Sequence, residues 1–181
     1  MRIIGGSLSG RVFHPPLKNW PTRPTTDMAK EALYNILMNK IDFEDAVFLD
    51  LFGGTGVHTL EFLSRGCKNV TYVDRFAKCV RWIKQTVEDL GLSENVQVIR
   101  SDVDAFLNAT GKHFSVIFAD PPYDLAWLDQ IPNKIYSRNV LMNDGLLIIE
   151  HSRNHSFQDH EHFVRERKYG QTRFSFFQKS E

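Results

Sequence analysis

Cysteine is rare in this chain of 181 residues, which holds only Cys67 and Cys79 and no CxxC pair. We therefore expect free thiols in a protein of the reducing cytoplasm. Long hydrophobic runs are also missing, so the sequence predicts no membrane span. The first residues, Met1 to Gly6, do not have the composition of a secretory signal peptide.

An excess of charge of one sign is absent as well, because 22 basic side chains balance 22 acidic ones. This balance argues against a general polyanion binder. The charge is unevenly distributed, since residues 1–40 hold six basic and two acidic residues. This basic N-terminal segment could meet phosphates, although ordinary solvated lysines and arginines explain the same excess nearly as well.

From residue 46 onward, short apolar runs alternate with segments of helical periodicity. Strands followed by helices predict an α/β fold with a mainly parallel sheet and helices on both of its faces. The tail from Phe163 to Phe177 predicts two more strands around Tyr169-Gly170, and so short a connection makes them antiparallel. The expected strands before it cover residues 46–49, 70–73, 96–99, 116–118 and 146–149, and a helix near residues 125–135 should be interrupted or kinked at Pro132.

The first 26 residues have a different character. Apolar runs on either side of Gly5 to Gly10 predict a small hairpin, and four prolines between His14 and Thr26 predict an extended loop. A helix should begin near Thr26 or Asp27, because either residue can cap it. We therefore divide the chain into an N-terminal extension over residues 1–26 and a main domain over residues 27–181.

The most informative motif is Asp120-Pro121-Pro122-Tyr123, directly after the strand-like run Ser115 to Ala119. Ligands bind at the carboxyl ends of strands in open α/β sheets. The prolines fix the backbone and remove two N–H donors, so nearby carbonyls remain available as acceptors. Asp120 and the Pro121 carbonyl could then hold an exocyclic amino group while Tyr123 stacks on the base. A turn cap and a rim aromatic are the structural alternatives for Asp120 and Tyr123.

A glycine-rich loop follows the first expected strand of the main domain. Its glycines permit a tight turn and close approach of a ligand. A dinucleotide-binding loop is the alternative, but position 59 is Thr instead of Gly or Ala, and Asp50 suits a cationic ligand better than a pyrophosphate. The loop consists of Asp50, Leu51, Phe52, Gly53, Gly54, Thr55 and Gly56.

Two further acidic residues end the next two strands. Asp74, followed by Arg75, could accept the hydroxyls of a ribose. Asp102 could accept from an adenine amino group while Val103 packs on the ring. Helix capping is an alternative role for both aspartates. Together with the two motifs above, they indicate a nucleoside-containing cofactor at the carboxyl edge of the sheet.

These motifs resemble those of class I S-adenosylmethionine-dependent methyltransferases, and most closely the RsmD family of bacterial 16S ribosomal RNA guanine-N2 methyltransferases. The resemblance extends from Arg2 to Phe177 and includes Arg23-Pro24-Thr25-Thr26-Asp27, the segment Glu31 to Leu37, and Leu63-Ser64-Arg65-Gly66. It implies a Rossmann-like, seven-stranded fold that ends in an antiparallel strand. It also implies S-adenosylmethionine as cofactor, ribosomal RNA within a small subunit as partner, and a loop containing Arg23 and Thr25 over the cofactor.

Two other functions remain open from the residues alone. A DNA adenine-N6 methylase would use the same Asp120 motif, although such enzymes usually carry an added recognition domain. A non-catalytic ribosome-assembly factor would have no need for an intact cofactor loop. We expect a monomer from the size and single-domain architecture. We expect no metal, because the histidines at 151, 155, 160 and 162 lack a clear ligand spacing and nearby cysteines.

Overall fold

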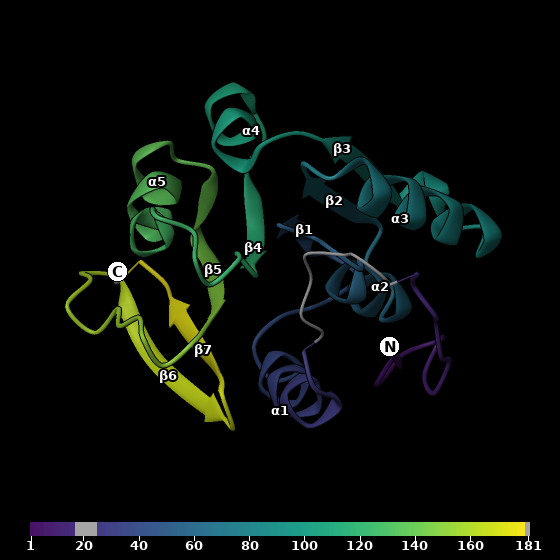
Figure 1. Cartoon of the computed structure of the whole chain (residues 1–181), viewed down its shortest axis with the longest axis horizontal. Helices are drawn as coiled ribbons and strands as arrows, with labels where there is room; N and C mark the ends of the chain where they lie inside the picture. The colour runs from purple at the N-terminus through teal and green to yellow at the C-terminus, as the bar shows by residue number, and fades with distance from the viewer. Residues whose placement is uncertain (17–24, 180–181) are drawn as a thin grey trace.

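The computed structural model describes residues 1–16 and 25–179, and a seven-stranded sheet forms its centre (Figure 1). The strand order is β3-β2-β1-β4-β5-β7-β6. β1 to β5 are parallel, and β7 runs antiparallel to both of its neighbours. The strands are β1 (Val47–Leu51), β2 (Asn69–Asp74), β3 (Val96–Arg100), β4 (Phe114–Ala119), β5 (Leu141–His151), β6 (Phe163–Tyr169) and β7 (Thr172–Phe177).

Helices cover both faces of the sheet, as the alternating pattern predicts. They are α1 (Asp27–Leu37), α2 (Val57–Ser64), α3 (Ala77–Asp89), α4 (Val103–Ala109) and α5 (Ile131–Ser137), with short 3₁₀ turns η1 (Ser93–Asn95) and η2 (Leu128–Gln130). In Figure 1, α4 and α5 lie together at the upper left, whereas α1, α2 and α3 lie below and to the right. The α/β fold of the class I methyltransferases, expected from the sequence, is confirmed.

Two hydrophobic cores fill the space between the sheet and its helices. Alternate residues of each buried strand enter opposite cores: Phe118 packs with α1, α2 and α3, whereas Ile117 packs with α4 and α5. The same alternation explains the aromatic tail, where Phe174 and Phe176 join the first core and Phe177 joins the second. The expectation that these phenylalanines belong to the core is therefore correct.

Three local expectations need correction. β5 spans eleven residues instead of the four expected, and its register with β4 shifts between Phe114 and Val116. Pro132 lies in the first turn of α5, where a missing N–H costs nothing, so it begins a helix after η2 instead of kinking one. The N-terminal hairpin contains one isolated antiparallel bridge, between Arg2 and Val12, in place of two strands.

The first helix of the main domain begins where expected. The Thr26 hydroxyl accepts a hydrogen bond from the Ala29 N–H at 3.3 Å, which caps α1. Over the described part of the chain, no helix is both long and apolar enough to span a bilayer.

Candidate active site

The topology places the site at the carboxyl ends of β1 and β4. The chain runs outward from β1 through β2 to β3, then returns to the other side of β1 to form β4 and β5. Connections therefore leave β1 and β4 in opposite directions, which opens a crevice beyond these strand ends. Leu51 and Ala119 are paired at this edge, so the glycine-rich loop and the Asp120 motif begin side by side.

A cavity of about 410 Å³ occupies the crevice. It brings together nearly all of the candidate residues, although they come from five separate parts of the chain. Gly56 is not among the lining residues, and Arg23 lies outside the described residues. The lining includes Thr25, Asp50, Phe52, Gly53, Gly54, Thr55, Asp74, Arg75, Asp102, Val103, Asp120, Pro121, Pro122 and Tyr123.

The glycine-rich loop is shaped by close packing against β2 and α3. A Cβ atom on Gly53 would lie 2.2 Å from the Tyr72 ring, whose hydroxyl donates to the Gly54 carbonyl at 2.8 Å. Gly56 has a φ of +75° and approaches Ile83 closely, so it enables the turn into α2 without lining the cavity. Phe52 also has a positive φ, of 58°, which is costly for a bulky residue. The loop is thus held in one shape before any ligand binds.

The acidic residues that follow β2 and β3 both accept backbone N–H groups, but only Asp102 caps a helix, since the N-cap position of α3 is Phe76. Asp74 is buried and accepts N–H groups from Gly54 at 2.9 Å and Phe76 at 2.7 Å. Asp102 caps α4 by accepting from the Asp104 N–H at 2.9 Å. Both nevertheless line the cavity. Because each carboxylate oxygen has two acceptor sites, these backbone contacts orient the side chains and leave capacity for a ligand.

Asp50 provides a buried carboxyl at the floor of the crevice. Its Oδ2 accepts from the Thr59 hydroxyl at 2.7 Å and the Thr59 N–H at 3.0 Å. Burial outweighs these hydrogen bonds and raises the pKa of Asp50 to about 7. A cationic ligand in the cavity would favour the ionised form, which fits the expected ammonium and sulfonium groups of S-adenosylmethionine.

A second pair of acidic residues lies at the ends of β4 and β5. Ala119 and Ile149 are paired, so Asp120 and Glu150 follow at adjacent positions of the two strands. Burial, followed by the charges of Glu150 and Asp50, raises the pKa of Asp120 well above its usual value. The Thr25 hydroxyl donates to Glu150 at 2.8 Å, which holds the segment before α1 against this edge.

The carbonyl groups of the Asp120 motif differ in whether they already have a hydrogen-bond partner. The Pro122 carbonyl accepts from the Leu125 N–H at 2.9 Å, and the Tyr123 carbonyl lies 3.2 Å from the His155 Nε2. Among the described residues, no hydrogen bond ends on the Pro121 carbonyl. The motif therefore offers this carbonyl and the Asp120 carboxyl as acceptors at one corner of the cavity.

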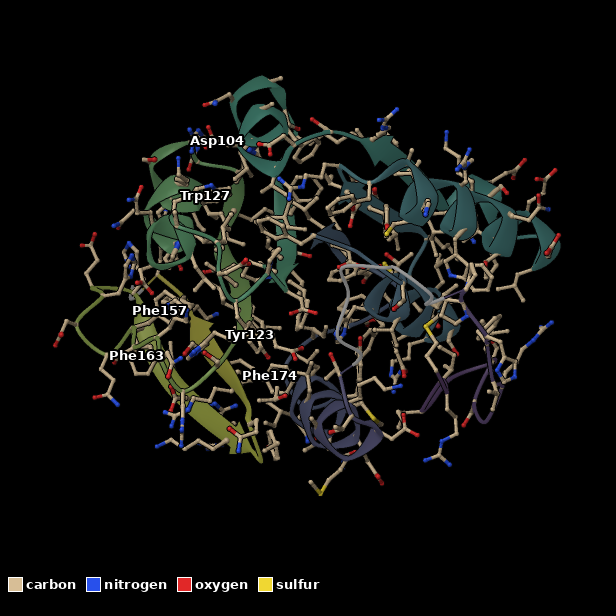
Figure 2. All side chains as sticks on the ribbon, in the orientation of Figure 1. Asp104, Tyr123, Trp127, Phe157, Phe163 and Phe174 are labelled. Carbon is tan, nitrogen blue, oxygen red and sulfur yellow. The ribbon has the colours of Figure 1, made fainter. Side chains whose placement is uncertain are left out.

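Sequence reasoning missed two aromatic residues that line the cavity, Trp127 and His58. Trp127 lines the cavity from the same loop as Tyr123 and lies 5.9 Å from the Phe52 ring (Figure 2). His58 also lines it, with Nδ1 2.9 Å from the Tyr34 hydroxyl and with Nε2 buried and unpaired among the described residues. Burial, and then the charge of Lys30, lowers the pKa of His58 to about 3, so the ring is neutral.

The histidines near the C-terminal end have hydrogen-bonding roles. His151 is buried and contacts the Ser175 hydroxyl at 2.8 Å, whereas His160 contacts the Asn133 side chain at 3.1 Å. No group of three or more ligating side chains in residues 1–16 and 25–179 is placed to hold a metal ion. Both cysteines are buried and free.

Comparisons with known proteins agree with this geometry. The profile of the family described as conserved hypothetical protein 95 matches residues 1–178. A Bacillus subtilis protein named putative rRNA methyltransferase YlbH is 36% identical over 156 residues, which cover 84% of this chain and 83% of that protein. The Escherichia coli ribosomal RNA small subunit methyltransferase D is 32% identical over 151 residues, covering 83% and 74% of the two chains.

Solved structures give the same picture. The structure described as putative methyltransferase yhhF from Escherichia coli superposes with a TM-score of 0.84 and 28% identity, covering 99% of this chain and 97% of that one. The Thermus thermophilus 16S rRNA N2 G1207 methyltransferase, solved with AdoMet and guanosine, shares the fold with a TM-score of 0.69 and 21% identity, and covers 99% and 49% of the chains. The expected activity, methyl transfer from S-adenosylmethionine, is confirmed, and the chain belongs to the conserved hypothetical protein 95 family, which is the RsmD family recognised from its sequence.

Proposed function

We propose that this protein transfers a methyl group from S-adenosylmethionine to the exocyclic N2 amine of a guanine in 16S ribosomal RNA. The observation that carries the proposal is the corner of the cavity where Asp120 and the Pro121 carbonyl face the crevice beside the glycine-rich loop. An amine needs two acceptors, one for each N–H, and this corner supplies two next to the expected cofactor.

The residues of the cavity suit the parts of the cofactor. Asp74, at the end of β2, is the candidate acceptor for the ribose hydroxyls, and Asp102 with Val103 is the candidate adenine site. Asp50 is the candidate counter-charge to the cationic end, with the loop from Phe52 to Thr55 beside it. When bound, the cofactor supplies an electrophilic methyl group on a sulfonium.

The Asp120 motif then prepares the amine. The lone pair of a guanine N2 amine is delocalised into the ring, so the nitrogen is a poor nucleophile. Two acceptors steer the nitrogen toward a pyramidal shape and aim the lone pair at the methyl group. Holding both reactants in attack geometry can supply on the order of 7–11 kcal/mol. Tyr123 stacking on an extruded base would add about 1–3 kcal/mol.

Asp120 also stabilises the positive charge that develops on nitrogen during transfer. It need not be a strong base beforehand, because the product ammonium is very acidic. A bound sulfonium and the charge developing on nitrogen would favour the ionised carboxylate, against the burial that raises the pKa of Asp120. Arg23 and the basic residues of the N-terminal extension are the candidate phosphate contacts, and the two-part division at residue 26 remains a prediction.

The likeness to small-subunit methyltransferases supports a small ribosomal subunit as the substrate-bearing particle. We place the reaction in the cytoplasm and propose a monomer, since the described residues form one sheet with its helices around the cavity.

The proposal is tested by incubating the protein with labelled cofactor and unmodified small subunits, then mapping the methyl group by mass spectrometry. We expect N2-methylguanine from the wild-type protein. Asp120→Ala should lower the rate by at least a hundredfold, on the order of the loss seen when one transition-state partner is removed. Asp144→Asn, which alters an exposed carboxylate near the other end of β5, is the matched control. Wild-type activity in Asp120→Ala, or a label on adenine, would reject the proposal.

A further inference from the structure

His155 joins two segments that meet at the Asp120 motif. It belongs to the β5–β6 connection, residues 152–162, and 15% of its side chain is exposed. Its Nδ1 lies 2.8 Å from Oδ1 of Asp129, and its Nε2 lies 3.2 Å from the carbonyl oxygen of Tyr123. One imidazole thus contacts both the motif and the η2 turn that follows it.

Both partners of this ring are hydrogen-bond acceptors. An ionised carboxylate and a backbone carbonyl have no proton to donate. A neutral imidazole carries one N–H and can satisfy only one of them, whereas an imidazolium donates to both. Each ring nitrogen therefore lies against an oxygen acceptor, one on the η2 turn and one on the Asp120 motif.

The segment that carries His155 is itself well fixed. The His155 N–H donates to the Ser152 carbonyl at 3.3 Å, which forms a turn directly after β5. Two residues further on, Phe157 is buried and packs edge-to-face against His151 at 5.0 Å and Phe177 at 5.4 Å. The imidazole is thus anchored to the sheet on both sides along the chain, and it can transmit this rigidity to the motif.

We propose that His155 is a positioning residue, which holds the Tyr123 end of the Asp120 motif in the geometry needed for base binding. This inference rests on the proposed function. The Pro122 carbonyl is held by Leu125, so fixing the Tyr123 carbonyl as well orients the peptide planes on both sides of the Tyr123 Cα, from which the ring projects. Figure 2 shows Tyr123 and Phe157, the residues at the two ends of this arrangement.

Two titratable side chains lie against the His155 ring among the described residues, those of Asp129 and His151. Asp129 faces it from η2, the Tyr123 phenol belongs to the motif, and the His151 ring lies edge-on with its centroid 6.4 Å away. Burial is the main cause that lowers the pKa of His151, so that ring tends to stay neutral. Asp129 is therefore the acidic side chain in contact with the His155 ring.

The first test compares His155→Ala with His160→Ala. His160 lies in the same connection and contacts the Asn133 side chain in α5 instead of the motif, which makes it the matched control. We expect His155→Ala to lower kcat for methyl transfer about tenfold, the effect of losing one hydrogen bond to a charged group. Binding of S-adenosylhomocysteine should stay within about twofold of wild type in both variants. Equal transfer rates for the two variants would overturn the proposal.

The second test uses Asp129, an exposed residue whose replacement should not disturb folding. In Asp129→Asn the amide can donate to Nδ1 while Nε2–H still donates to Tyr123, so activity should persist. Asp129→Leu removes the partner of Nδ1 and should lower kcat. If His155→Ala does not fold, these two variants test the positioning role in its place. Identical methylation rates for Asp129→Asn and Asp129→Leu would contradict that role.

A spectroscopic arm separates this inference from the proposed function. In protein labelled with ¹⁵N-histidine, Nε2 of His155 should carry a proton in a hydrogen bond, because the Tyr123 carbonyl can only accept. A bare Nε2 in the wild-type protein would refute the positioning role. Failure of the wild-type protein to methylate small subunits would instead reject the proposed function, whatever the spectra show.

Discussion

At the scale of single residues, the buried carboxyl of Asp50 makes both folding stability and cofactor binding depend on pH. Its pKa is raised from 3.8 to about 7, so the folded, cofactor-free protein binds this proton more tightly than the unfolded chain does. The contribution of Asp50 to stability is therefore full below about pH 4 and falls as pH rises toward 7. A cationic cofactor reverses this preference, because it stabilises the ionised carboxylate.

We therefore predict that cofactor binding below pH 7 releases a proton from Asp50, and that affinity weakens as pH falls. Calorimetry at pH 6 in buffers of different ionisation enthalpy measures the number of protons released. Asp50→Asn should release about one proton fewer than the wild-type protein. Asp120 also has a raised pKa, so some pH dependence should persist in the variant. An unchanged proton count would show that Asp50 does not respond to the bound cation.

Most of the residues that line the cavity could be predicted from their type and from their position directly after a strand. The carboxyl ends of parallel strands meet at one edge of the sheet, however long the connections between the strands are. The residues that were missed have no such signal. His58 lines the cavity because Tyr34 of α1 and Phe118 of β4 hold its ring, at 2.9 Å from the hydroxyl and 3.8 Å between ring centroids. These contacts join positions far apart in the chain, and sequence spacing carries no information on them.

At the scale of structural elements, the glycine-rich loop depends on the β2 residue beneath it. The clearance between Gly53 and the Tyr72 ring has no room for a side chain, and the Tyr72 hydroxyl holds the Gly54 carbonyl. A methyl group at position 53 would push the ring away and break this hydrogen bond. The shape of the loop is therefore a property of β1 and β2 together.

We predict that Gly53→Ala lowers the free energy of unfolding by about 1–3 kcal/mol, the usual cost of overpacking, and weakens cofactor binding as well. Thermal unfolding and calorimetry measure the two effects. Gly111→Ala is the matched control, because a Cβ there meets nothing within 4 Å and its backbone needs no positive φ. Similar stability and affinity in both variants would mean that the loop tolerates a different shape.

Periodicity located the strands and helices well, since each buried strand must be apolar and each helix must present one apolar face. It could not give the length of β5, because its first part, Leu141 to Asp144, is mostly exposed and carries no buried pattern. It also misjudged Pro132, since a proline that kinks a helix and one that begins a helix look the same in sequence. Tertiary context decides both cases.

At the scale of the whole molecule, the balance of 22 basic and 22 acidic residues limits how the protein finds its substrate. Affinity for RNA through the phosphate backbone grows with the number of phosphates neutralised, and a chain without net positive charge neutralises few of them. The cavity adds to this effect, because Asp50, Asp74 and Asp120 all line it. Recognition must therefore depend on shape and on a target base that is already accessible.

We predict that assembled small subunits are methylated at least about tenfold more efficiently than protein-free 16S ribosomal RNA. Only a folded particle has a fixed surface shape, and a protein without net positive charge must recognise its substrate by shape. Initial rates with the two substrates at about 0.1 M salt measure the difference, and a salt series measures the phosphate contribution. For protein-free RNA, we expect a plot of log Kd against log salt concentration to have a small slope. Each neutralised phosphate contributes roughly 0.7 to this slope, and we expect only a few phosphates to be neutralised. A steep slope, or faster methylation of the protein-free RNA, would show that the basic N-terminal segment dominates recognition and that net charge is a poor guide to this protein.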